Sequence, residues 1–134
     1  MTGSSAPRLK RDRGAAAVEF ALLLPVLVAL ILGIIEFGYA FFVWGNVAGA
    51  AREGARNYAI TKNEAQAKTA AKSAFPALGD ADIGVSPAPS SCRDGAPATV
   101  TITYSYSTLT GLLEGITGAK TLSLQGKGTM RCGG

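Results

Sequence analysis

One carboxylate, Glu19, stands in an otherwise apolar run near the start of the chain. The run covers residues 15–35 and would span about 31 Å as a helix, which is enough to cross the hydrocarbon core of a bilayer. A charged side chain in such a helix costs roughly 2.5–3.5 kcal/mol at mid-membrane and less near the interface. Glu19 is therefore a candidate functional residue. The alternative is a carboxylate that only extends to the inner membrane interface.

The two cysteines, Cys92 and Cys132, are the other residues whose chemistry stands out. Neither belongs to the Cys-x-x-Cys pair of redox enzymes, and two isolated thiols without histidine are a poor metal site. A bond between them would close a loop of about 40 residues, worth about 3–4 kcal/mol in the chain-entropy model. We expect a structural disulfide, which matters for a C-terminal region too small to bury a large core.

Catalysis is disfavoured by what the composition lacks. The chain of 134 residues has no histidine, no phosphate-binding loop of the Walker type, and only scattered acidic residues beyond the apolar run. We predict that the protein is not an enzyme and needs no cofactor or metal. The net charge of +4 is modest, and no basic face interleaved with aromatic residues suggests nucleic acid.

The positive charge is better explained by membrane topology. Four basic residues precede the apolar run: Arg8, Lys10, Arg11 and Arg13. Because basic flanks stay in the cytoplasm, we expect the N-terminus inside and the C-terminal region outside, where a disulfide persists. The apolar stretch is longer than that of a cleaved secretory signal, and aromatic residues follow it at 37–44. A retained membrane helix is favoured over a removed signal peptide.

The helix is expected to continue to about residue 60. Small residues dominate residues 45–59, and Gly45, Gly49 and Gly54 would line faces thin enough for another helix to approach. A flexible linker is the alternative. Pro25 predicts a gentle bend, and we interpret Glu36 as an interfacial carboxylate beside the aromatic residues.

Residues 61–134 predict a small α+β domain. A short helix is expected after residue 61, ending near residues 75–76, and a brief strand around residues 83–85. Residues 99–106 alternate with a period of two, which predicts a strand with Val100, Ile102, Tyr104 and Tyr106 on one face. Residues 121–130 alternate more weakly, and residues 109–119 suggest a turn of helix or an apolar loop. A short antiparallel sheet of two to three strands, packed on the long helix, follows.

Residues 13–21, with Pro25, Gly33 and Glu36 and the segment 50–56, resemble the TadE-like family. These are minor pseudopilins of the tight-adherence (Flp) pilus, a type IVb pilus of bacteria; the related TadF-like proteins are a looser resemblance. The resemblance implies a pilin-like architecture of three parts: a cleaved basic leader at 1–14, a hydrophobic helix at 15–60 that spans the membrane over about 15–36, and a periplasmic domain at 61–134.

The resemblance also implies roles for individual residues. Gly14 would be the last leader residue, and Ala15 would be the new N-terminus after cleavage by a membrane prepilin peptidase. Glu19 would pair with the N-terminal amine of a neighbouring subunit during assembly.

The expected location is the bacterial inner membrane, with a single pass. The expected partners are the prepilin peptidase, a TadF-like protein, the Flp-type major pilin and proteins of the secretion platform. The residues leave open whether the subunit enters the fibre. An alternative function is an unprocessed, single-pass envelope protein that binds other molecules.

Overall fold

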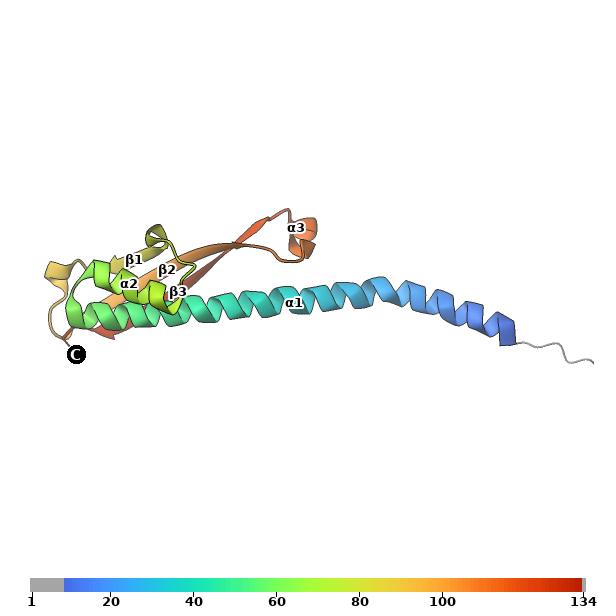
Figure 1. The fold of residues 1–134 in the computed structure, drawn as a ribbon, viewed down its shortest axis with the longest axis horizontal. Coiled ribbons are helices and arrows are strands. Elements are labelled where there is room, and N and C mark those ends of the chain that lie inside the picture. The colour runs from blue at the N-terminus through green and yellow to red at the C-terminus, as the bar shows by residue number, and fades with distance from the viewer. Residues whose placement is uncertain (1–8, 134) are drawn as a thin grey trace, which may run out of the picture.

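The structure, a computed structural model, describes residues 9–133, except for the side chains of residues 9–13 and 81. The first eight residues of the expected leader lie outside the described part. A single helix, α1 (Leu9–Thr61), forms a long rod. Pro25 lies inside α1, and the rod is bent in its N-terminal part (Figure 1). A bend is expected there, because proline removes one backbone donor and its ring crowds the preceding turn.

The remaining elements pack along the C-terminal half of α1 (Figure 1). Among them, three strands form an antiparallel sheet in the order β1-β2-β3. The expected α+β class, a long apolar helix with a short helix and a small antiparallel sheet, is confirmed. The elements after α1 are α2 (Glu64–Ala74), the 3-10 turns η1 (Asp80–Asp82) and η2 (Pro89–Ser91), β1 (Ile83–Ser86), β2 (Pro97–Ser107), α3 (Leu112–Thr117) and β3 (Thr121–Arg131).

The central strand β2 carries the alternation that its sequence predicts. Val100, Ile102 and Tyr106 are buried, whereas Thr103 and Ser105 between them are exposed. The buried side chains form one core cluster with Val43, Val47 and alanines of α1. The inward face of the sheet thus packs on the helix, as the period of two requires.

Strand β3 lies in direct backbone contact with α1. A Cβ atom built on Gly126 would come within 2.8 Å of Val47 Cγ1, and one built on Gly128 would collide with the Ala51 carbonyl. Only glycine permits so close an approach. The later strand residue, Gly128, contacts the later helix residue, Ala51. The chain of β3 therefore runs in the same direction as that of α1.

The short helix α2 packs beside the end of α1. Asn63 caps its N-terminus by accepting a hydrogen bond from the Gln66 N–H at 3.2 Å. Ala67 and Ala71 are buried on the side that faces Gly54 of α1. Small side chains on both helices therefore allow the two axes to lie close together.

A disulfide closes the end of the sheet that lies near the C-terminus of α1. Cys92 and Cys132 are bonded with their Cα atoms 5.7 Å apart, and both are buried. The Gly133 N–H donates to the Ala59 carbonyl at 3.0 Å, so the last strand is also tied to the end of α1.

The contact between β3 and α1 can be tested with Gly128→Ala. The added methyl group would overlap the backbone of α1, so we expect a loss of about 1–3 kcal/mol in the free energy of unfolding. Gly49→Ala is the matched control, because an added Cβ there meets nothing within 4 Å and gains helix propensity, up to about 1 kcal/mol. Thermal unfolding of the full chain in detergent measures both. Equal midpoints for the two variants would contradict the contact.

Candidate functional site

The N-terminal part of α1 exposes its apolar side chains. The helical segment Gly14–Thr61 has a mean hydropathy of 2.8 in its most apolar window, and none of that window is buried. By length and composition it could cross a membrane. Gly14, Ala15 and Glu19 are all exposed at its start. Since Ala15 and Glu19 are four residues apart in one helix, they lie on the same face.

The three candidate packing glycines differ in their surroundings. A Cβ on Gly54 would meet Ala67 O, Ala71 Cβ and Val100 Cγ1, each at 3.3 Å. Gly54 therefore serves the packing of α1 against its own domain. Gly45 and Gly49 meet no atom within 4 Å of an added Cβ, so among the described residues they lie on an open side of the helix.

Glu36 is the residue whose environment the sequence did not reveal. It was expected to be an interfacial carboxylate beside the aromatic residues, and the structure shows that it is only 1% exposed. Its carboxylate accepts hydrogen bonds from the Leu109 N–H at 3.2 Å, the Thr110 N–H at 2.9 Å and the Thr110 hydroxyl at 2.8 Å. These donors belong to the loop that follows β2. Glu36 therefore fastens this loop to α1, a contact that the interpretation as an interfacial carboxylate did not include.

Two tyrosines lie near this carboxylate. Tyr39 of α1 and Tyr106 of β2 meet edge to face, with ring centroids 5.4 Å apart. Burial and the nearby charges of Glu36 and Tyr39 raise the pKa of Tyr106. Within the described part of the chain, its buried hydroxyl has no hydrogen-bond partner. The neutral ring therefore acts as an apolar spacer between the sheet and α1.

The surface of α2 carries ion pairs. Lys68 pairs with Glu64 at 2.8 Å, and Lys72 pairs with Asp80 at 2.6 Å. The hydrogen bond that Lys68 donates to Glu64 raises the pKa of Lys68, and the hydrogen bond that Asp80 accepts from Lys72 lowers the pKa of Asp80. These pairs are largely solvated, so they contribute little to stability and form no enclosed site.

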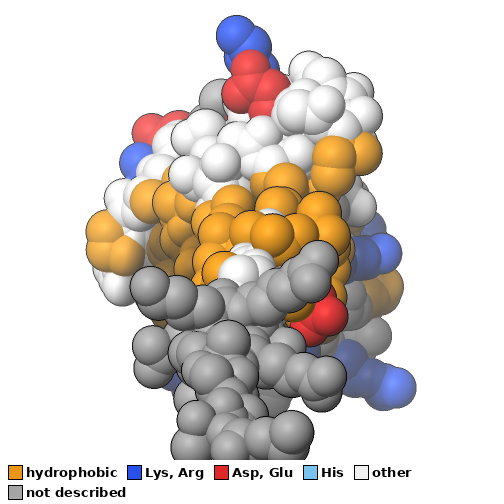
Figure 2. Space-filling model, turned by 90° about the vertical axis from the view of Figure 1, so that its right-hand side faces the viewer, with side chains coloured by type: hydrophobic (Ala, Val, Ile, Leu, Met, Phe, Trp, Pro, Cys, Tyr) orange, Lys and Arg blue, Asp and Glu red, His pale blue; other side chains and the backbone are white. Residues whose placement is uncertain are grey.

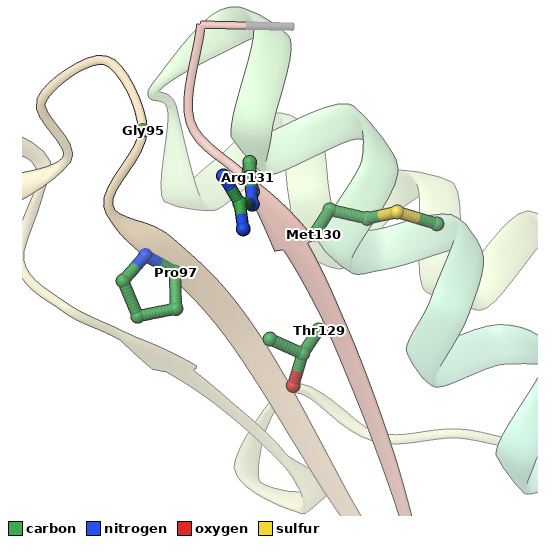
Figure 3. A pocket seen from close by; sticks show the side chains of 5 residues that line it. All are labelled: Gly95, Pro97, Thr129, Met130 and Arg131. Carbon is green, nitrogen blue, oxygen red and sulfur yellow. The ribbon is translucent and has the colours of Figure 1, made fainter.

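A shallow depression lies on the surface at the disulfide end of the β2–β3 pair (Figure 3). It is lined by Gly95, Pro97, Thr129, Met130 and Arg131, and the side chains of Thr129 and Met130 point to opposite sides of β3 (Figure 3). Arg131 has no acidic residue beside it in this lining. No cluster of three or more potential metal ligands occurs among the described side chains. Neither feature suggests catalysis.

A comparison with protein families matches residues 14–56 to the family described as TadE-like protein. The matched segment begins at Gly14 and contains Glu19, Glu36 and the face of α1 that contacts β3. The resemblance to the TadE-like family is thus confirmed over this segment, while the α2–β3 region lies outside it. Neither the curated proteins nor the solved structures contain a match to this chain.

The role of Glu36 predicts a local effect of its removal. Glu36→Ala leaves two backbone donors and one hydroxyl without their acceptor, at a cost of about 1–3 kcal/mol. We expect the Leu109 and Thr110 amides to exchange with deuterium roughly tenfold faster or more, and Glu36→Gln to fall between. Peptide-level exchange mass spectrometry measures this. Glu53→Gln, an exposed carboxylate of the same helix, is the control, and unchanged loop exchange in Glu36→Ala would refute the role.

Proposed function

We propose that the protein is a pseudopilin-like structural subunit of a Tad/Flp type IVb pilus assembly machine, needed for pilus biogenesis and surface adhesion. The observation that carries the proposal is the exposed apolar part of α1, which starts at Gly14 and holds the single carboxylate Glu19. The family match begins at the same residue. Its action is assembly through helix contacts, without catalysis or cofactor.

The proposed location is the bacterial inner membrane, with one pass and the domain in the periplasm. Basic residues concentrate before the span and favour a cytoplasmic N-terminus. The Cys92–Cys132 disulfide lies at the opposite end of the molecule, and an oxidising compartment preserves such a bond. Charge and redox chemistry therefore support the same orientation.

Processing would remove residues 1–14. Gly14 lies in the second turn of α1, which begins at Leu9, so a protease must first unwind a short helix end. Helix ends open at little cost, and glycine lowers this cost by about 1 kcal/mol relative to alanine. An added Cβ on Gly14 would meet no atom within 4 Å, so no described side chain packs against this position.

Assembly would then use the new α-amino group of Ala15 and the carboxylate of Glu19. In an apolar environment, a charge without its partner is costly in free energy, so arrangements of neighbouring subunits that separate the amine from the carboxylate are disfavoured. Glu19 would therefore fix the register between subunits. Gly45 and Gly49, which lie on an open side of α1, are the proposed contact for a partner helix. The proposed partners are a TadF-like protein, the Flp-type major pilin and the secretion platform.

The competing function is an unprocessed membrane-anchored binding protein of the envelope. The N-terminus of the mature protein distinguishes the two. In cells that carry a matching prepilin peptidase, mass spectrometry should find Ala15 as the first residue. Gly14→Arg should leave the longer form in the membrane, while Gly3→Arg, which adds the same charge elsewhere in the leader, should be cut normally. An intact leader on the wild-type chain would favour the competing function.

Glu19 offers a second test. Glu19→Ala should leave insertion and cleavage intact, since losing a charge makes insertion easier. Pilus formation and recovery of partner subunits should fail, because the neighbour's amine would be left unpaired at a cost of about 3–5 kcal/mol. Glu19→Gln should be intermediate, and Glu53→Ala, on the same helix beyond the span, should behave as wild type. Normal assembly of Glu19→Ala at matched protein levels would show that Glu19 only extends to the interface.

A further inference from the structure

The loop between β2 and β3, residues 108–120 including α3, exposes apolar side chains. We call it the hairpin tip. Leu109 is 56% exposed and Ile116 is 74% exposed, and Leu112 and Leu113 are half-buried. In Figure 1 the tip overhangs α1 at the end of the sheet nearer the N-terminus of the helix. Large exposed apolar side chains gathered in a short loop are unusual for a surface that faces only water.

The position of the tip along α1 follows from two independent contacts. The hydrogen bonds to Glu36 hold the loop at that level of the helix. The register of β3 on α1 agrees, since Gly126 of β3 contacts Val47. Four residues of β3, from Gly126 back to Leu122, cover about 13 Å. About nine residues of α1 cover the same length. Leu122, where β3 emerges from the tip, is therefore level with about residue 38. The tip lies just past the C-terminal end of the apolar run 15–35.

The surface of α1 at this level is apolar as well. Phe37, Phe41 and Trp44 are exposed, and with Ala40 and Leu124 they line a shallow apolar groove between α1 and β3. Seen from the N-terminal end of the molecule, hydrophobic side chains gather in the centre and charged side chains lie at the periphery (Figure 2). The exposed apolar surface of α1 thus continues beyond residue 35, at least as far as Trp44.

We propose that the hairpin tip contacts the outer leaflet of the bilayer that holds α1, with Leu109 and Ile116 in the boundary between headgroups and acyl chains. The proposal rests on the membrane orientation given under Proposed function. The occupant is lipid because the tip is fixed at the level where the spanning run ends. Glu114 and Lys120, which pair at 3.6 Å, supply the polar rim that a headgroup region accommodates.

The experiment uses tryptophan emission and brominated lipids with the full-length protein in phosphatidylethanolamine and phosphatidylglycerol vesicles. Trp44, the chain's one tryptophan, is first removed as Trp44→Phe. Ile116→Trp then reports on the tip and Leu27→Trp on the span. Thr69→Trp, on the exposed face of α2 about 27 Å farther along the axis of α1, reports on the membrane-distal domain. Bromine is placed either near the headgroup or deep in the acyl chain.

We expect lipids with shallow bromine to quench the Ile116→Trp reporter and to shift its emission to the blue. Deep bromine should quench the Leu27→Trp reporter, and the Thr69→Trp reporter should respond to neither lipid. A quenched span reporter with an unquenched tip reporter overturns the inference while leaving the membrane assignment intact. If the tip reporter is instead shifted to the blue only at high protein density, a second copy covers the tip and the inference is also overturned. An unquenched span reporter refutes the membrane assignment itself.

Discussion

The close contact between β3 and α1 governs the arrangement of the whole domain. Gly126 and Gly128 bring the strand backbone against Val47 and Ala51 of the helix, at a separation that no larger residue allows. A sheet seated this closely cannot slide along the helix without a collision between side chains and backbone. Its register on α1 is therefore set, and so is the level at which the strands end.

The carboxylate of Glu36 completes that arrangement at one end and the disulfide at the other. At the tip, Glu36 satisfies two backbone donors and one hydroxyl of a loop that has little other packing on α1. Charge-assisted hydrogen bonds of this kind are stronger than neutral ones. At the far end, Cys132 and Gly133 hold the last residues to Cys92 and to Ala59. Glu36 and the disulfide region thus hold the two ends of the sheet, and the glycines of β3 pack its middle against α1.

The sequence predicted the elements better than their contacts. Local periodicity was sufficient for the long helix and for the strand that contains Val100 and Ile102, since burial repeats with the period of each element. The weaker alternation of residues 121–130 has a physical cause: the positions that face α1 are Gly126 and Gly128, which are buried without being hydrophobic. Glu36 bonds to Thr110, which lies 74 residues away in the sequence. A local sequence pattern cannot predict a contact at that separation. For the same reason the sequence could not say that Gly54 packs within the domain and Gly45 does not.

The continuity of α1 from the apolar run to the end of the domain has a mechanical consequence. About 25 residues of helix follow Glu36 before α1 ends at Thr61, a rigid arm of about 38 Å. Spanning helices tilt by about 20° on average, so such a tilt would displace the far end of the arm sideways by about 13 Å. In the proposed membrane orientation, the interfacial anchors and neighbouring helices that set the tilt would thereby also determine where the distal end of the domain lies.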